Sequence, residues 1–205
     1  MPRLIGIIDY GMGNLHSVQK ALESMGAQTR LTNNPLVLAS CDKFVLPGVG
    51  AFDDAVIELD KRGLIAAIKG AVESKKIFLG ICLGMQLLFE ESLEARMAKG
   101  LNLLKGRVQK FIPKKSLKVP HIGWNQLDLK NTACPLLENI RDKSYVYFCH
   151  SYYSEPDERG VIAATCNYGI DFTSVVWKDN LYGVQFHPEK SQDVGLGILK
   201  NFVEM

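Results

Sequence analysis

The chain has 205 residues, of which 47% are hydrophobic and 22% charged, and its formal net charge is +2. These values are typical of one globular domain, here residues 1–205, and so small a charge gives no reason to expect binding to nucleic acid or to a membrane surface. Five scattered cysteines without a C-x-x-C pair argue against a disulfide framework and a structural zinc site, and favour a reducing compartment. The first residues lack a signal-peptide core and no stretch reaches membrane-spanning length, so we expect a cytoplasmic protein.

The first half of the chain alternates between strand and helix patterns. Apolar runs bounded by turn residues predict strands, and apolar residues spaced three or four apart predict helices. The expected strands are 4–8, 28–31, 43–46 and 77–81; the expected helices are one that ends near Met25, before Gly26, one over 51–74 with a break near Gly63, and one from Leu83 to about Leu93. This alternation predicts βαβ units and a mostly parallel central sheet with helices on both faces.

The second half consists of short runs rich in β-branched and aromatic residues, separated by turns. We expect strands at 107–112, 126–129, 144–148, 161–166, 173–177 and 181–185, a hairpin at 178–181, a short helix at 135–140 and a last helix at 194–202. Such closely spaced strands predict an antiparallel portion added to the parallel sheet. The fold class is therefore mixed α/β.

The turn between strand 77–81 and the helix after it contains Gly80-Ile-Cys82-Leu-Gly84, the cysteine form of the G-x-S-x-G nucleophile elbow. Glycine on either side of a nucleophile lets the chain reverse from strand to helix without a side-chain clash. The turn presents Cys82 at the start of the helix, where backbone N–H groups and the helix dipole stabilise a thiolate. Taken alone, the motif fits a small buried cysteine in a tight turn equally well.

A histidine and a carboxylate follow the last expected strand, in Phe186-His187-Pro188-Glu189. His187 and Glu189 are two residues apart, so on an extended backbone they face the same side, and the proline stiffens the segment. An imidazole oriented by a carboxylate can exchange a proton with a cysteine thiol. Because open α/β sheets place their sites at the carboxyl ends of strands, where both motifs lie, we predict a catalytic triad of Cys82, His187 and Glu189.

An oxyanion hole should accompany the nucleophile. The N–H of Leu83, directly after the cysteine, is one natural donor. The second donor should come from Pro47-Gly-Val49-Gly50, whose glycines permit a backbone conformation that aims the N–H of Val49 or Gly50 inward. The alternative for this segment is a plain strand-to-helix turn.

Two motifs, Gly-Ile-Cys-Leu-Gly-Met-Gln at 80–86 and Phe-His-Pro-Glu at 186–189, resemble the signatures of the class I (triad) glutamine amidotransferases. Segments 9–18, 46–52, 121–125 and 148–153 resemble one branch of that family, the glutaminase subunits of imidazole glycerol phosphate synthases. The resemblance covers almost the whole chain and meets no departure at a catalytic position. It implies a flavodoxin-like fold, in which a mostly parallel sheet is flanked by helices, with the antiparallel addition in the second half.

The resemblance implies an enzyme that hydrolyses glutamine to glutamate and ammonia without a cofactor or a metal. Cys82 would attack the side-chain amide, and His187 would move the protons. Gln86 matches a position that binds the glutamine, and Ser151 and Tyr152 match a segment that contacts its α-amino and carboxylate groups.

Ammonia is mostly protonated at neutral pH, so it must reach its acceptor without meeting solvent, and the chain has no obvious second catalytic domain. The resemblance implies a heterodimer with a (β/α)8-barrel synthase subunit that makes imidazole glycerol phosphate and an aminoimidazole carboxamide ribonucleotide. Asn14, Trp124, Tyr147 and Lys190 match interface positions of the family. Trp124 could instead belong to the core, and Lys190 to the solvated surface.

Weaker signals point elsewhere. Residues 11–16 resemble a dinucleotide fingerprint, but His16 replaces its third glycine. The basic run 110–118 fits a solvated loop. Cys149 fits a small buried hydrophobe. Among the other histidines, only His150 is expected near the site. Two rival functions are a free-standing cysteine hydrolase, whose acid normally precedes its histidine, and a regulatory module that keeps the fold without turnover.

Overall fold

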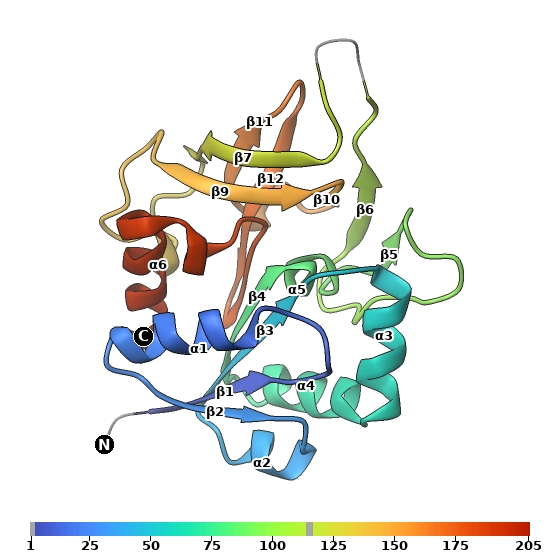
Figure 1. The fold of residues 1–205 in the computed structure, drawn as a ribbon, viewed down its shortest axis with the longest axis vertical. Helices are drawn as coiled ribbons and strands as arrows, with labels where there is room; N and C mark the ends of the chain where they lie inside the picture. Colours follow the sequence, from blue (N-terminus) through green and yellow to red (C-terminus); the bar gives the residue numbers. More distant parts are fainter. Residues whose placement is uncertain (1–2, 114–116) are drawn as a thin grey trace.

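The computed structural model describes residues 3–113 and 117–205 and is built on a large central sheet (Figure 1). Within these ranges the sheet has eleven strands. Five neighbouring strands are parallel, in the order β2 (Gln28–Thr32), β1 (Leu4–Ile8), β3 (Lys43–Gly48), β4 (Ile77–Cys82) and β13 (Leu181–Val184). This is the flavodoxin-like order. The predicted parallel sheet is therefore confirmed.

The second half of the chain extends one edge of this sheet with antiparallel strands, as expected. β12 (Asp171–Lys178) pairs with β13, followed by β10 (Tyr152–Pro156), β6 (Gly106–Lys110) and the short β5 (Glu91–Ser92), while β11 (Ile162–Asn167) and β8 (Asp128–Leu129) branch from β12. β7 (His121–Gln126) and β9 (Tyr145–His150) form a separate antiparallel ribbon (Figure 1). The hairpin at 178–181 joins β12 to β13.

Helices cover both faces of the parallel part. α1 (Leu15–Ser24) and α6 (Gln192–Glu204) pack on one face, and α2 (Pro35–Ala39), α3 (Phe52–Lys61) and α4 (Leu64–Glu73) pack on the other. Neighbouring residues of β3 alternate between the two layers, with Val45 in the first and Phe44 and Leu46 in the second. Strands buried on both faces must be apolar throughout, which explains the continuous apolar run. No helix in the described ranges is long and apolar enough to cross a membrane.

The helix after the elbow is much shorter than predicted. α5 spans Leu83–Gln86 and does not continue to Leu93. The carbonyls of Leu87 and Leu88 accept hydrogen bonds from the N–H groups of residues 101, 103 and 104 instead of continuing a helix. Residues 87–89 are buried, as are the four residues of α5.

Several elements of the second half differ from the expected ones. The strand expected at 126–129 is divided between the last residue of β7 and the two residues of β8, and neither β10 nor α2 in the first half was predicted. Only Pro135–Leu137 of the helix expected at 135–140 is helical, as a 3-10 turn. Polar and glycine residues interrupt β7, so its strand character depends on pairing with β9 rather than on an apolar pattern. Residues 114–116 of the basic run lie outside the described part of the chain.

Candidate active site

The nucleophile elbow is built as the sequence predicts. Cys82 lies between β4 and α5 with φ 55° and ψ −110°, a backbone conformation that non-glycine residues rarely adopt and that typically costs on the order of 1–3 kcal/mol. A Cβ atom on Gly80 would lie 2.5 Å from the carbonyl oxygen of Gly84, and a Cβ on Gly84 would lie 1.8 Å from that of Leu46. Both positions therefore require glycine, and the tight turn leaves Cys82 at the carboxyl end of β4.

His187 and Glu189 meet through a turn rather than along a strand. β13 ends at Val184, and Pro188–Lys190 form a 3-10 turn directly after His187. His187 Nδ1 donates a hydrogen bond to Glu189 Oε1 over 2.9 Å, and both side chains are almost fully buried. The expectation of an extended segment is wrong, because Pro188 occupies the first helical position, where its fixed φ favours a turn.

The electrostatics of His187 favour its protonated form. Burial lowers the pKa of this imidazole, but hydrogen bonds and charge interactions with Cys82 and Glu189 outweigh burial and raise the pKa well above its ordinary value. The Nδ1–H is committed to the carboxylate, so Nε2 is the nitrogen available to the cysteine sulfur. The three side chains can therefore form a thiolate–imidazolium pair with a carboxylate behind it.

Ser191 holds this arrangement to the neighbouring ribbon. Its hydroxyl donates to the carbonyl of His187 over 2.6 Å and accepts the N–H of Tyr147 over 2.9 Å. The N–H of His187 also donates to the carbonyl of Tyr147 over 2.9 Å. Sequence reasoning missed Ser191, because its role depends on contacts with a strand more than 40 positions away.

A cavity of about 340 Å³ opens over the cysteine. It brings together most of the predicted site, because its lining includes Val49, Gly50, Cys82, Leu83, Gln86, Ser151, Tyr152, His187 and Lys190. His150 lines the cavity too, as expected. Cys149 also lines it but is exposed, so the prediction of a buried cysteine is wrong. On β9 its side chain alternates with those of buried Phe148 and buried His150, and so it points outward.

The cavity contains one acidic side chain that the sequence did not single out. Glu94 lines the cavity, and its Oε2 accepts the N–H of Phe52 at the start of α3. Partial burial raises the pKa of this carboxyl group. Glu94 lies eight positions beyond Gln86 and outside every motif. Its place in the cavity therefore depends on how the chain folds back after the elbow, which the sequence pattern does not show.

The Gln86 side chain has a fixed orientation. Its Nε2 donates to the carbonyl of Tyr152 over 2.9 Å and to Gln185 Oε1 over 3.0 Å, which uses both amide hydrogens. No described residue donates to its Oε1. Gln185, buried and also missed by sequence reasoning, places its own Nε2 3.8 Å from the Cys82 sulfur.

The four predicted interface residues lie on three different elements. Trp124 and Tyr147 are cross-strand partners on the β7–β9 ribbon, with ring centres 6.0 Å apart. Trp124 is 45% exposed, so it does not belong to the core. Asn14 directly precedes α1 and is half-buried, and Lys190 is exposed where the 3-10 turn ends. Of these four residues, only Lys190 lines the cavity above Cys82.

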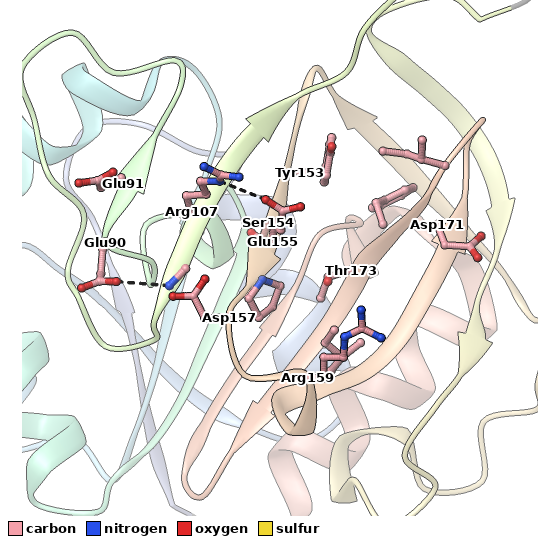
Figure 2. Close-up of a pocket in the computed structure, with 15 residues that line it drawn as sticks. Glu90, Glu91, Arg107, Tyr153, Ser154, Glu155, Asp157, Arg159, Asp171 and Thr173 are labelled. Atoms are coloured by element: carbon pink, nitrogen blue, oxygen red, sulfur yellow. Dashed lines mark hydrogen bonds and ion pairs between the residues drawn. The ribbon is translucent and has the colours of Figure 1, made fainter.

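A larger cavity, of about 1020 Å³, lies between β5, β6, β10 and β12. Figure 2 shows several charged side chains in its lining, among them Arg107, which forms an ion pair with Glu155. The two groups are 3.1 Å apart. Its lining contains no cysteine and no histidine. No group of three His, Cys, Asp or Glu side chains in residues 3–113 and 117–205 is arranged to hold a metal ion. The predicted catalytic cysteine and histidine therefore line the smaller cavity and not this one.

Comparison with known proteins agrees with this geometry. Residues 6–205 match the family "Glutamine amidotransferase class-I". The solved structures of PurLQS from Thermotoga maritima and of the glutaminase domain of Trypanosoma brucei CTPS share the fold, with TM-scores of 0.75 and 0.71 at 19% and 16% identity. These alignments cover 98% of this chain and 96% and 92% of the two structures. The chain belongs to the class-I glutamine amidotransferases and is an enzyme of that kind.

Its curated relatives narrow the family further. The chain is 50% identical over 207 residues to the imidazole glycerol phosphate synthase subunit HisH of Geobacter sulfurreducens, an alignment that covers 98% of each sequence. It is 51% identical to HisH of Geobacter metallireducens, with 97% of this chain and 96% of that protein covered, and 48% identical to HisH of Acinetobacter baylyi, with 98% and 97% covered. Among the class-I enzymes, the chain therefore belongs to the HisH family.

Proposed function

We propose that the chain is the glutaminase subunit of an imidazole glycerol phosphate synthase of histidine biosynthesis and hydrolyses glutamine through Cys82, His187 and Glu189. The observation that carries this proposal is the elbow cysteine at the carboxyl end of β4, beside an imidazole whose Nδ1 is 2.9 Å from a buried carboxylate. Its membership of the HisH family supports the same role.

The reaction follows from these positions. The Cys82 thiolate attacks the side-chain amide carbon of glutamine, and the N–H groups of Leu83 and of the Val49–Gly50 segment stabilise the oxyanion. The C–N bond breaks as His187 gives its proton to the departing ammonia. Water then attacks the thioester, His187 accepts a proton from it, and glutamate leaves as the thiolate re-forms. Glu189 orients the ring throughout.

The lining of the cavity matches the two ends of glutamine. The substrate carries an ammonium and a carboxylate at one end and an amide at the other. Gln86 offers its free Oε1 as a hydrogen-bond acceptor for an N–H of glutamine, and the Ser151–Tyr152 segment lies beside it. Glu94 is the anionic group of the cavity. We assign it the α-ammonium, because a partly buried carboxylate is stabilised by a partner of the opposite sign.

The ammonia needs a second active site protected from water. We propose a (β/α)8-barrel synthase subunit as partner, which docks over the cavity and against Asn14, Trp124, Tyr147 and Lys190. The exposed Trp124 beside Tyr147 supports this surface, since aromatic residues that are accessible in the free protein are enriched in interfaces.

Labelling by a glutamine-mimicking diazoketone tests the assignment. The synthase complex is incubated with the reagent and its nucleotide ligand, and peptides are analysed by mass spectrometry. We expect a single adduct on Cys82, which excess glutamine prevents and Cys82→Ser abolishes. Cys149 lines the same cavity and is more exposed, so Cys149→Ser is the matched control and should leave labelling intact. An unmodified Cys82, or equal labelling of both cysteines, contradicts the assignment.

A further inference from the structure

Two buried histidines lie side by side at the wall of the proposed glutamine cavity, which His150 lines. His121 on β7 and His150 on β9 are cross-strand partners, 3% and 6% exposed. His121 Nδ1 lies 3.0 Å from His150 Nε2. Phe111, Phe148 and Phe172 surround both rings. Neither histidine has a part in the proton transfers described above, and both lie on the ribbon that carries two of the proposed docking residues, Trp124 and Tyr147.

The hydrogen-bond partners determine which nitrogen of each ring carries the proton. His150 Nδ1 lies 2.7 Å from the carbonyl of Tyr152, which can only accept, so Nδ1 is protonated. Burial lowers the pKa of His150 to about 3 and that of His121 to about 4, so both rings are neutral. His150 Nε2 is therefore an acceptor, and the facing His121 Nδ1 must donate to it.

The other end of the pair agrees with this direction. A neutral His121 that carries its proton on Nδ1 has an acceptor at Nε2, and Asn125 Nδ2 lies 3.3 Å away. The Asn125 amide cannot be reversed, because its Nδ2 also donates to the carbonyl of Asn167 over 2.9 Å and its Oδ1 accepts the N–H of Gln126. Every link from Asn125 to Tyr152 is therefore consistent with one pair of tautomers.

The chain of hydrogen bonds ends in the catalytic site. The carbonyl of Tyr152 accepts from His150 and also from Gln86 Nε2. Gln86 donates in turn to Gln185, whose Nε2 approaches the Cys82 sulfur. A shift of the Tyr152 carbonyl would remove one of the two acceptors that orient the Gln86 amide beside the cavity.

We propose that His121 and His150, both held as Nδ1–H tautomers, are positioning residues for glutamine: they fix the Tyr152 carbonyl that orients Gln86. The expected effect on glutamine kinetics rests on the proposed glutaminase function, whereas the tautomers of the two rings do not depend on it. If only His121 carried its proton on Nε2, two lone pairs would face each other between the rings, and if only His150 did so, two N–H donors would face each other. If both rings did so, the Tyr152 carbonyl would lose the hydrogen bond from His150. Each case leaves a buried polar group without a partner.

The first test reads the tautomers directly in the wild-type complex. Two-bond ¹H–¹⁵N correlation spectra of histidine-labelled protein distinguish a protonated from an unprotonated ring nitrogen. We expect the unprotonated nitrogen to be Nε2 in both His121 and His150 at pH 7, with and without glutamine analogue bound. An Nε2–H tautomer, or a cationic ring, at either position overturns the proposal, whatever the enzymatic activity of the protein.

The second test separates positioning from folding by a pair of variants. His150→Asn keeps an N–H where the Nδ1–H lies, whereas His150→Phe keeps a ring but no donor. In the synthase complex we expect the KM for glutamine to rise about tenfold or more in H150F and to stay within about threefold of wild type in H150N. His16→Asn, at an exposed histidine, is the matched control and should not change KM. Equal KM values in H150F and H150N, or a loss of kcat alone, would refute a positioning role.

Discussion

Glu189→Gln removes the charge next to His187 while keeping the shape of the side chain. The contact from Nδ1 to Oε1 is 2.9 Å, and the two side chains are only 5% and 1% exposed, so solvent screens the charge poorly. Hydrogen bonds to charged groups contribute about 1.5–3 kcal/mol and neutral ones about 1 kcal/mol. The variant should therefore lose roughly 1–2 kcal/mol of imidazolium stabilisation, which lowers kcat/KM for glutamine about 5- to 30-fold and the pKa of His187 by about 1.

The assay is glutamate release by the synthase complex as a function of pH, together with an NMR titration of the His187 ring in the same variant. Asp193→Asn removes an exposed carboxylate at the start of α6, four residues beyond Glu189, and is the control for a general loss of charge. It should behave as wild type. If Glu189→Gln keeps kcat/KM within twofold and leaves the His187 titration unchanged, the carboxylate does not support the imidazolium and the reasoning is wrong.

Three further predictions follow from the packing and the docking surface. Gly84→Ala places a Cβ 1.8 Å from the Leu46 carbonyl oxygen, so urea denaturation should show that this variant is destabilised by several kcal/mol. Nothing lies within 4 Å of a Cβ on Gly70 in α4, so Gly70→Ala should be stabilised by up to about 1 kcal/mol. Trp124→Ala should weaken barrel-subunit binding by about 2 kcal/mol in calorimetry, without a change in Tm. Burial lowers the pKa of His150 to about 3, so this ring binds a proton more readily in the unfolded chain. Its contribution to the free energy of unfolding is therefore complete above pH 6.5 and is lost as the pH falls toward 3. Over this range the urea midpoint should fall less in H150N than in the wild-type protein.

The parts of the fold that could be predicted are those where neighbouring residues decide the structure. Residues 4–8 and 43–46 read as buried strands because both of their faces pack under helices. The break near Gly63 also follows locally, since this residue adopts a left-handed conformation between α3 and α4.

The errors occur where distant segments compete for backbone hydrogen bonds. The elbow helix stops at Gln86 because the N–H groups of residues 101, 103 and 104 take the carbonyls of Leu87 and Leu88. β7 is recognisable only through its register with β9. In both cases the local pattern is weak or misleading, and pairing across many positions determines the outcome.

The sequence by itself determined which groups form the proposed site: a cysteine between two glycines that the turn requires, and a histidine with a carboxylate two residues later. Only the tertiary structure decided how these groups are supported. Ser191 and Glu94 lie outside every motif, and the pairing of His121 with His150 joins two separate segments, so each of these contacts depends on a part of the chain that is far away in the sequence. A strained turn is encoded by the few residues that form it, whereas the direction of a buried hydrogen bond depends on partners that only folding brings together.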